Sequence, residues 1–295
     1  MNLSELYVKK SYQIFAPILE PYLQYFESLR PDLRKAGIPY NLREYLSMAV
    51  MTVLVVFIIE FPLLSFITTF MFGNPPVAIL FSLTISIGFS AMFFLFFYIY
   101  PSLQIGNRRK KIDYALPFAT IYLATTSGSR MPPQNMFKVL LEFEGDSEMG
   151  KEARKIVRDT ELLGISVIDS IKRVATESPS DSFSELLWGM STTISTGGNL
   201  SMYLHEKAKS LMKEYKLRLE KYSSTLGTIV EMYLTLVVVG SIFFIIMSSI
   251  MSSFGMGGSM EELLIIAQFF VIFLGLPAIN AGFIMLIKSL SPRAL

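Results

Sequence analysis

Few residues in this sequence could carry out enzymatic chemistry. There is no cysteine, which excludes a disulfide, a thiolate metal site and a thiol nucleophile, and His205 is the single histidine. Gly150-Lys151 is followed by Glu152, so the sequence has no phosphate-binding loop of the Gly-Lys-Ser/Thr type. The apolar segments contain no aspartate, which disfavours an aspartyl intramembrane peptidase. We therefore expect a protein that is not an enzyme, with no catalytic residue, no metal site and no cofactor.

Glu60 is the one acidic or basic residue inside an apolar segment, and it lies two residues before Pro62. An ionisable group in a bilayer is costly unless it is neutral or paired, so Glu60 is a candidate polar site within the membrane. In one interpretation it is a protonated or hydrogen-bonded contact between helices, beside a carbonyl freed by Pro62. In the other, it receives a cationic group from a partner helix.

Much of the chain consists of predicted membrane spans. Hydrophobic residues make up 52% of the chain and charged residues only 17%, against about a quarter in soluble domains. Four stretches are almost free of charge, and each reaches the roughly 20 residues that a helix needs to cross the hydrocarbon layer. These stretches are residues 46–72, 77–100, 232–254 and 263–287.

The positions of lysine and arginine predict the orientation. All 26 basic residues lie outside the four stretches and in three places. They come before the first stretch, between the second and third stretches, and after the fourth stretch, where there are two. None remains for the short connections near residues 73–76 and 255–262. By the positive-inside rule, both termini and the central region lie in the cytoplasm of a multi-pass protein of the cell membrane. The net charge of +2 is too small to indicate nucleic acid as a partner.

The sequence thus predicts an all-α membrane protein with four transmembrane helices and a cytoplasmic six-helix bundle. Its segments are a cytoplasmic N-terminal segment (1–45), a transmembrane hairpin (46–100), a helical domain (101–231), a second transmembrane hairpin (232–288) and a cytoplasmic tail (289–295). Apolar residues at helical spacing place the helices of the domain at about 108–127, 133–143, 147–163, 166–176, 181–195 and from 199 onward. The last of these runs without proline into the third span.

Several helix ends carry recognisable signals. Asn41 with Glu44, Ser166 with Asp169, and Ser182 with Glu185 have capping-box spacing, and Pro133 suits a first helical turn. A weak repeat of helix, glycine turn and helix occurs around residues 123–128 and 190–198, where glycine would supply the left-handed backbone of a helix end. Two such hairpins fit the predicted bundle.

The motifs of the central region, taken in order, resemble a known family. They are Leu-Ala-Thr-Thr-Ser-Gly-Ser-Arg-Met-Pro-Pro at 123–133, Glu-Leu-Leu-Gly at 161–164 with Ala175, residues 179–183, Thr-Gly-Gly-Asn-Leu-Ser-Met-Tyr-Leu at 196–204, and a long charged helix that passes Glu231 into a span. Over about residues 112–254 this order resembles the type II secretion system F domain, in particular its archaeal branch or the single-domain proteins of tight-adherence pili.

The resemblance implies a membrane platform protein of a type II secretion, type IV pilus or archaellum machine. Such a protein docks a hexameric cytoplasmic ATPase and couples it to the movement of pilin-like subunits between the lipid bilayer and a filament. Many relatives carry two F domains and this chain has one, which suggests a homodimer or pairing with a second F-domain subunit. By the same resemblance, the candidate structural or coupling residues are Gly128, Gly164, Gly197, Gly198 and Glu231.

The basic residues Arg108, Arg109, Lys110 and Lys111 are candidate contacts to anionic lipid or to the ATPase, or a plain topology signal. A transporter or channel is an alternative function, but it would be expected to show more polar groups and broken helices in the spans than Glu60 with Pro62 and Pro277 with Asn280. A membrane-anchored scaffold or signalling protein is the other alternative, and would have no effect on filament formation.

Overall fold

The computed structural model describes residues 3–129, 131–253, 266 and 268–290, and every element assigned in these ranges is a helix. Four of the helices are long and apolar enough to cross a membrane, which confirms the predicted all-α membrane protein. The predicted connection at 255–262 and residues 291–295 of the tail lie outside the described residues. The chain forms two compact units, Met1–Ala208 and Lys209–Leu295. The four membrane-compatible helices are Leu42–Phe72, Pro75–Gly128, Leu200–Ile250 and Gln268–Ser289.

The first unit begins with three short helices that pack beside the first span. They are α1 (Leu3–Leu19), the 3₁₀ helix η1 (Glu20–Phe26) and α2 (Leu29–Ala36). Leu29 and Leu33 of α2 are buried in one apolar cluster with Leu42, Tyr45 and Leu46 from the start of the first span. The spacing of four between Leu29 and Leu33 places both on one face of α2, so burial of this face fixes the helix against the span.

The first two spans form a hairpin of α3 (Leu42–Phe72) and α4 (Pro75–Gly128), as the sequence predicts. Gly73 ends α3 in the left-handed conformation, and α4 begins two residues later. Two hydrogen bonds fix the alignment of the helices. The Thr68 hydroxyl donates to the Ala78 carbonyl (3.2 Å) near the turn, and the Tyr45 hydroxyl donates to the Phe97 carbonyl (2.7 Å) near the open end.

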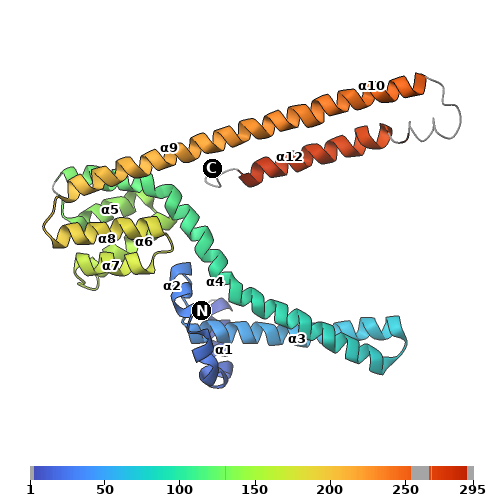
Figure 1. Ribbon diagram of the computed structural model, residues 1–295. Helices are drawn as coiled ribbons and strands as arrows, with labels where there is room; N and C mark the ends of the chain where they lie inside the picture. Colours follow the sequence, from blue (N-terminus) through green and yellow to red (C-terminus); the bar gives the residue numbers. More distant parts are fainter. Residues whose placement is uncertain (1–2, 130, 254–265, 267, 291–295) are drawn as a thin grey trace. The chain divides into compact units, whose positions relative to one another are not determined.

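The helix that contains the second span does not end where the sequence suggests. A separate helix is expected from about residue 108, after Pro101, but α4 is one helix of 54 residues that contains both Pro101 and Pro117. A proline inside a helix removes one hydrogen bond and favours a bend rather than a break when packing holds both sides. Figure 1 shows α4 bending as it leaves the hairpin and continuing into the helical bundle. The hairpin and the bundle therefore share a helix.

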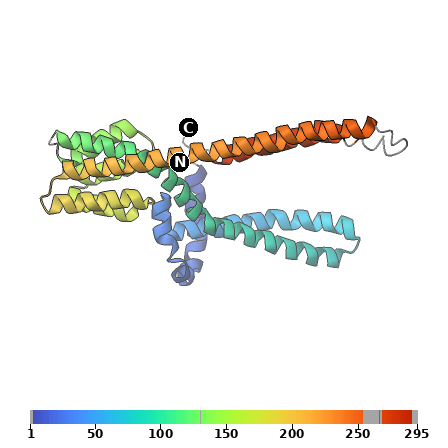
Figure 2. The ribbon, with the colours of Figure 1, turned by 45° about the horizontal axis from the view of Figure 1, so that its top comes forward.

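The bundle consists of the last part of α4, four short helices and the start of α9 (Figures 1 and 2). The short helices are α5 (Pro133–Glu144), α6 (Glu148–Glu161), α7 (Val167–Glu177) and α8 (Asp181–Ser195), and α9 spans Leu200–Tyr233. These bounds lie within two residues of the predicted ones for all four short helices. Buried residues at helical spacing form the core, among them Ile112, Leu116, Leu123, Phe137, Leu140, Met149, Ile156, Ile171, Phe183, Leu187, Met190 and Leu204.

The caps agree only in part with the sequence signals. The Asn41 backbone N–H donates to the Glu44 carboxylate (2.9 Å) at the start of α3, as expected. The cap of α8 is Ser180, whose hydroxyl accepts the backbone N–H three residues on (3.0 Å), while Ser182 lies inside the first turn. Ser166 precedes α7 but its side chain makes no capping bond. At Ser166 and Ser182 the sequence therefore has the spacing of a capping box, but the hydrogen bonds of a capping box do not form there.

The second unit contains the rest of α9, the π-helical segment η2 (Leu234–Val239), α10 (Gly240–Ser253), a second π-helical segment η3 (Val271–Gly275) and α12 (Leu276–Leu290). Helical backbone continues unbroken from Leu200 to Ser253, as the lack of proline predicts. The Tyr233 hydroxyl donates to the Asn280 side-chain oxygen (2.9 Å), and the Gln268 amide donates to the Ser248 hydroxyl. Polar contacts between apolar helices therefore connect the third and fourth spans.

We expect Gly189→Ala to destabilise the bundle. A Cβ at Gly189 in α8 would clash with the hydroxyl oxygen of Tyr203 in α9, and this hydroxyl donates to the Leu186 carbonyl (3.2 Å). Burial, together with Glu185, raises the pKa of Tyr203 to about 12, so the phenol stays protonated and keeps this bond. Overpacking of this kind costs about 1–3 kcal/mol.

The measurement is the midpoint of thermal unfolding in detergent, followed by circular dichroism. The control is Gly106→Ala in α4, where a Cβ meets no atom within 4 Å, so the midpoint should stay the same or rise. Equal midpoints for the two variants would show that α8 and α9 do not approach as closely as described.

Candidate functional site at the junction of hairpin and bundle

Arg108 joins three elements at the point where α4 enters the bundle. Its side chain is only 6% exposed. The Nε group donates to Glu148 (2.7 Å) and one terminal nitrogen donates to Glu152 (2.8 Å), both in α6. The other terminal nitrogen donates to the backbone carbonyl of Lys35 (2.7 Å) at the end of α2. One guanidinium therefore holds the N-terminal segment, the membrane hairpin and the bundle together.

The two acids are positioned by the helix period, because Glu148 and Glu152 are four residues apart on α6. The Glu152 side chain is fully buried and also accepts from Lys155 (2.9 Å), while Glu148 also accepts from Lys151 (2.8 Å). Burial alone would raise the pKa of Glu148. The hydrogen bonds from Lys151 and Arg108 outweigh it, so the pKa of Glu148 lies below its usual value and the carboxylate stays charged.

Gly37 leaves the room that Arg108 requires. It ends α2 with a φ of 69°, and its backbone N–H donates to the Arg34 carbonyl (3.0 Å). A Cβ at this position would lie 2.7 Å from the nearest guanidinium nitrogen of Arg108. Glycine is therefore favoured twice, by the left-handed backbone and by the close approach of the side chain.

The basic run at 108–111 does not form one exposed surface. Arg108 is expected as a lipid or ATPase contact, but it is buried by its bonds to α2 and α6. Arg109 is half-exposed and pairs with Asp181 (2.8 Å) and Asp113 (3.6 Å). Lys110 and Lys111 are exposed and have no ion pair within the part of the chain that the structure describes. The basic groups available to a partner here are therefore Lys110 and Lys111.

Two further acids connect the helices of the bundle. Asp113 of α4 accepts from the hydroxyl of Ser180, the cap of α8. Asp159 of α6 is fully buried and accepts from Ser170 (3.2 Å) and Arg173 in α7. Sequence reasoning missed these residues, and the only available signal was an acid on the otherwise apolar face of an amphipathic helix.

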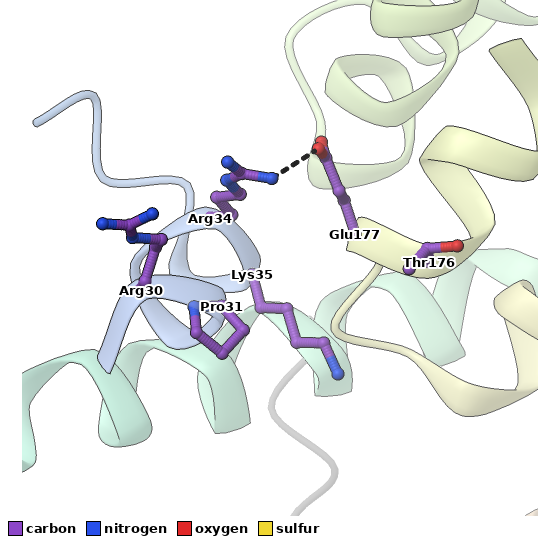
Figure 3. Close-up of a pocket in the computed structure, with 6 residues that line it drawn as sticks. All are labelled: Arg30, Pro31, Arg34, Lys35, Thr176 and Glu177. Carbon is purple, nitrogen blue, oxygen red and sulfur yellow. Dashed lines mark ion pairs between the residues drawn. The ribbon is translucent and has the colours of Figure 1, made fainter. Parts of the chain in front are cut away.

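A basic pocket lies between α2 and α7 (Figure 3). Its volume is about 210 Å³. In the close-up, the Arg34 guanidinium points across the pocket to Glu177 of α7 (3.7 Å), while Arg30 and Lys35 extend from the same helix in other directions. The lining residues are Arg30, Pro31, Arg34, Lys35, Thr176 and Glu177.

Glu60 is partly exposed on α3 and forms no hydrogen bond or ion pair with the described residues. It lies between the two hydrogen bonds that align α3 with α4. In the same stretch of α4, the hydroxyls of Ser86 and Ser90 are buried without a hydrogen-bond partner. Glu60, Ser86 and Ser90 are thus polar groups of the hairpin without hydrogen-bond partners, and both interpretations of Glu60 remain predictions.

The candidate glycines differ in conformation. Gly164 and Gly197 have φ values of 65° and 70° at helix ends, as a turn glycine would. Gly128 is the last residue of α4 and does not have a positive φ, and Gly198 also lacks one although a Cβ there would be 3.2 Å from Thr193. Glu231 is exposed near the end of α9, with no ion pair among the described residues.

The described residues contain no group of three or more side chains that could hold a metal ion. The interactions found at this junction are ion pairs and hydrogen bonds. The buried ion pairs fix the helices, and the exposed lysines present positive charge.

We expect Arg108→Gln to destabilise the first unit by about 3–5 kcal/mol, because it leaves the buried Glu152 carboxylate without its guanidinium partner. The matched control Lys110→Gln, an exposed position, should change stability by less than about 0.5 kcal/mol. Thermal unfolding in detergent measures both. If Arg108→Gln unfolded like the control, the ion network would not hold the junction.

The lowered pKa of Glu148 predicts a pH dependence. A carboxylate whose pKa is lower in the folded protein contributes stability above its unfolded value of 4.5, and this contribution disappears as the pH falls through the folded pKa. Unfolding midpoints measured from pH 6.5 to pH 3.5 should therefore fall less steeply for Glu148→Gln than for the wild-type chain. Parallel curves would contradict the assignment.

Comparisons with known proteins give one family match, which falls on the bundle and the helix that follows it. Residues 119–248 match the family model for protein F of the type II secretion system (T2SS). The matched region contains the end of α4, the four short helices, α9 and most of α10. No solved structure shows a significant match to the chain.

Two relatives come from the archaeon Methanocaldococcus jannaschii. An uncharacterized protein, MJ1286, is 27% identical over 135 residues, which are 46% of this chain and 23% of that protein. Flagella accessory protein J is 23% identical over 188 residues, which are 63% of this chain and 31% of that protein. The matches thus span less than a third of each relative's length. Residues 119–248 of this chain thus resemble protein F of the type II secretion system.

Proposed function

We propose that this chain is a membrane platform subunit of a type IV pilus-like or type II secretion assembly machine. The observation that carries the proposal is the family match over residues 119–248, which falls on a helical bundle that shares α4 with a membrane hairpin. The similarity to flagella accessory protein J favours a filament machine of the archaellum type. The protein belongs in the cell membrane as a multi-pass protein.

The proposed orientation places the bundle and both termini in the cytoplasm. Arg43 lies at the open end of the first hairpin and the basic run at 108–111 follows it, whereas the turn at residues 73–76 has no charge. Lys288 lies in the last turn of α12. Cytoplasmic loops are enriched in lysine and arginine, so this distribution supports the orientation.

The partner that supplies energy is a hexameric cytoplasmic ATPase in this proposal. The sequence has no phosphate-binding loop, so hydrolysis belongs to the partner. The bundle offers Lys110 and Lys111 as exposed positive charges close to the buried Arg108 junction. A partner that moves the bundle would act on the membrane hairpin through the same helix, α4.

Pilin-like subunits and a second F-domain subunit are the other proposed partners. The spans would guide pilin-like subunits between the bilayer and the filament. A second copy of this chain, or a related subunit, would supply another F domain. The small share of each relative that the matches cover, 23% and 31%, is compatible with relatives that hold more than one such unit.

We expect the detergent-solubilised protein to co-purify with the secretion ATPase of the same organism and to change its rate of ATP hydrolysis. The double charge reversal Lys110→Glu/Lys111→Glu should weaken binding by about tenfold or more, because like charges would then meet across the contact. Arg108 is unsuitable for this test, since its substitution would unfold the junction.

The matched control is Lys9→Glu/Lys10→Glu in α1, which reverses two exposed charges elsewhere in the chain. It should bind the ATPase like the wild-type chain. Neither binding nor a change in hydrolysis rate, with the protein shown to be folded, would contradict the platform function and favour a scaffold or a transporter.

A further inference from the structure

The pocket between α2 and α7 has an excess of positive charge. Three of its lining residues are basic and one, Glu177, is acidic. The existing ion pairs are largely exposed and therefore weak: Arg34 lies 3.7 Å from Glu177, and Arg30 pairs with Glu27 of the preceding turn (3.0 Å). The ammonium group of Lys35 has no ion pair among the described residues. The pocket therefore suits an anionic group that can accept several hydrogen bonds.

From the position of α2 we infer that this pocket lies beside the membrane surface. Its buried face, Leu29 and Leu33, packs on Tyr45 and Leu46, where the apolar part of α3 begins. Arg43, just before these residues, is exposed and pairs with Glu20 of η1 (3.1 Å). A helix that packs at the boundary between charged and apolar sequence lies at the depth of the lipid headgroups.

The neighbouring helices expose apolar side chains at the same end of the hairpin. The Tyr7 hydroxyl of α1 is hydrogen-bonded to Thr52 of α3 (2.8 Å), so α1 packs against the span. Four large side chains of α1 and η1 are more than half exposed. Tyrosine and isoleucine in such a position are typical of segments that lie in the membrane interface. These side chains are Ile14, Ile18, Tyr22 and Tyr25.

We propose that the α2–α7 pocket binds the phosphate of an anionic phospholipid while the exposed side chains of α1 and η1 lie among its acyl chains. Arg34 and Lys35 are the principal phosphate ligands, since arginine and lysine both donate charge-assisted hydrogen bonds to phosphate oxygens. The bound lipid would fix α2, and with it the carbonyl of Lys35 that accepts from Arg108. This site does not depend on the platform function.

The test uses the full-length protein in detergent with phosphatidylglycerol or phosphatidylcholine added, and native mass spectrometry to count retained lipids. The wild-type chain should retain phosphatidylglycerol in preference to phosphatidylcholine. Arg34→Gln and Lys35→Gln should each lower its retention about fivefold, the effect of one basic residue near an anionic lipid. Glu177→Gln should raise retention, because it removes the one negative charge of the pocket.

The controls are Lys213→Gln and Lys216→Gln, which remove exposed charges of α9 outside the pocket and should leave retention unchanged. Equal losses in the control and pocket variants would show unspecific attraction and overturn the proposal, as would no loss in the pocket variants. Glycerol 3-phosphate is added as a competitor in a further arm. If it displaced the lipid at equal concentration, the pocket would be a site for soluble phosphate esters, and the lipid assignment would be wrong.

Discussion

A guanidinium that is buried in a protein must be neutralised there, and Arg108 meets this requirement only where three elements come together. Its partners are two carboxylates of α6 and a backbone carbonyl of α2, at distances of 2.7–2.8 Å. Removal of any one partner leaves a charged or polar group buried, which is costly in the low dielectric of an interior. The position of the N-terminal segment, the bend of α4 and the start of α6 thus depend on one another. Gly37 belongs to the same constraint, because any side chain there would occupy the space of the guanidinium.

In the proposed platform, the shared helix α4 would transmit movement between the bundle and the membrane hairpin. The hairpin and the bundle are not joined by a loop that could absorb movement, since α4 continues from Pro75 to Gly128. A force on the bundle would therefore reach the hairpin along the backbone of α4, and the Arg108 network would carry part of it to α2. The unpartnered polar groups Glu60, Ser86 and Ser90 lie in the same hairpin. They are the place where such a movement could change contacts inside the membrane.

The sequence predicts most of the fold and less of the site. Helix periodicity and charge-free stretches locate the helices well because both depend on local pattern, and Pro133 begins α5 as expected. The continuation of α4 through Pro101 was missed, since whether a proline bends or ends a helix depends on tertiary packing. The burial of Arg108 was missed for a similar reason. Its partners lie 40 and 44 residues away in the sequence, and a basic run before a domain reads as a solvated surface. The one signal for this burial in the sequence was the spacing of Glu148 and Glu152, which places two acids on the same face of a helix.

The central claim is that this chain is needed to build a filament or pseudopilus from membrane-stored subunits. The most direct measurement is deletion of its gene in the organism that encodes it, followed by electron microscopy of surface filaments and by fractionation of the pilin-like subunits. The account predicts that filaments disappear, that processed subunits accumulate in the membrane, and that the wild-type gene restores assembly. Normal filaments and normal secretion in the deletion strain would contradict it and would favour a scaffold or signalling protein that only shares the F domain.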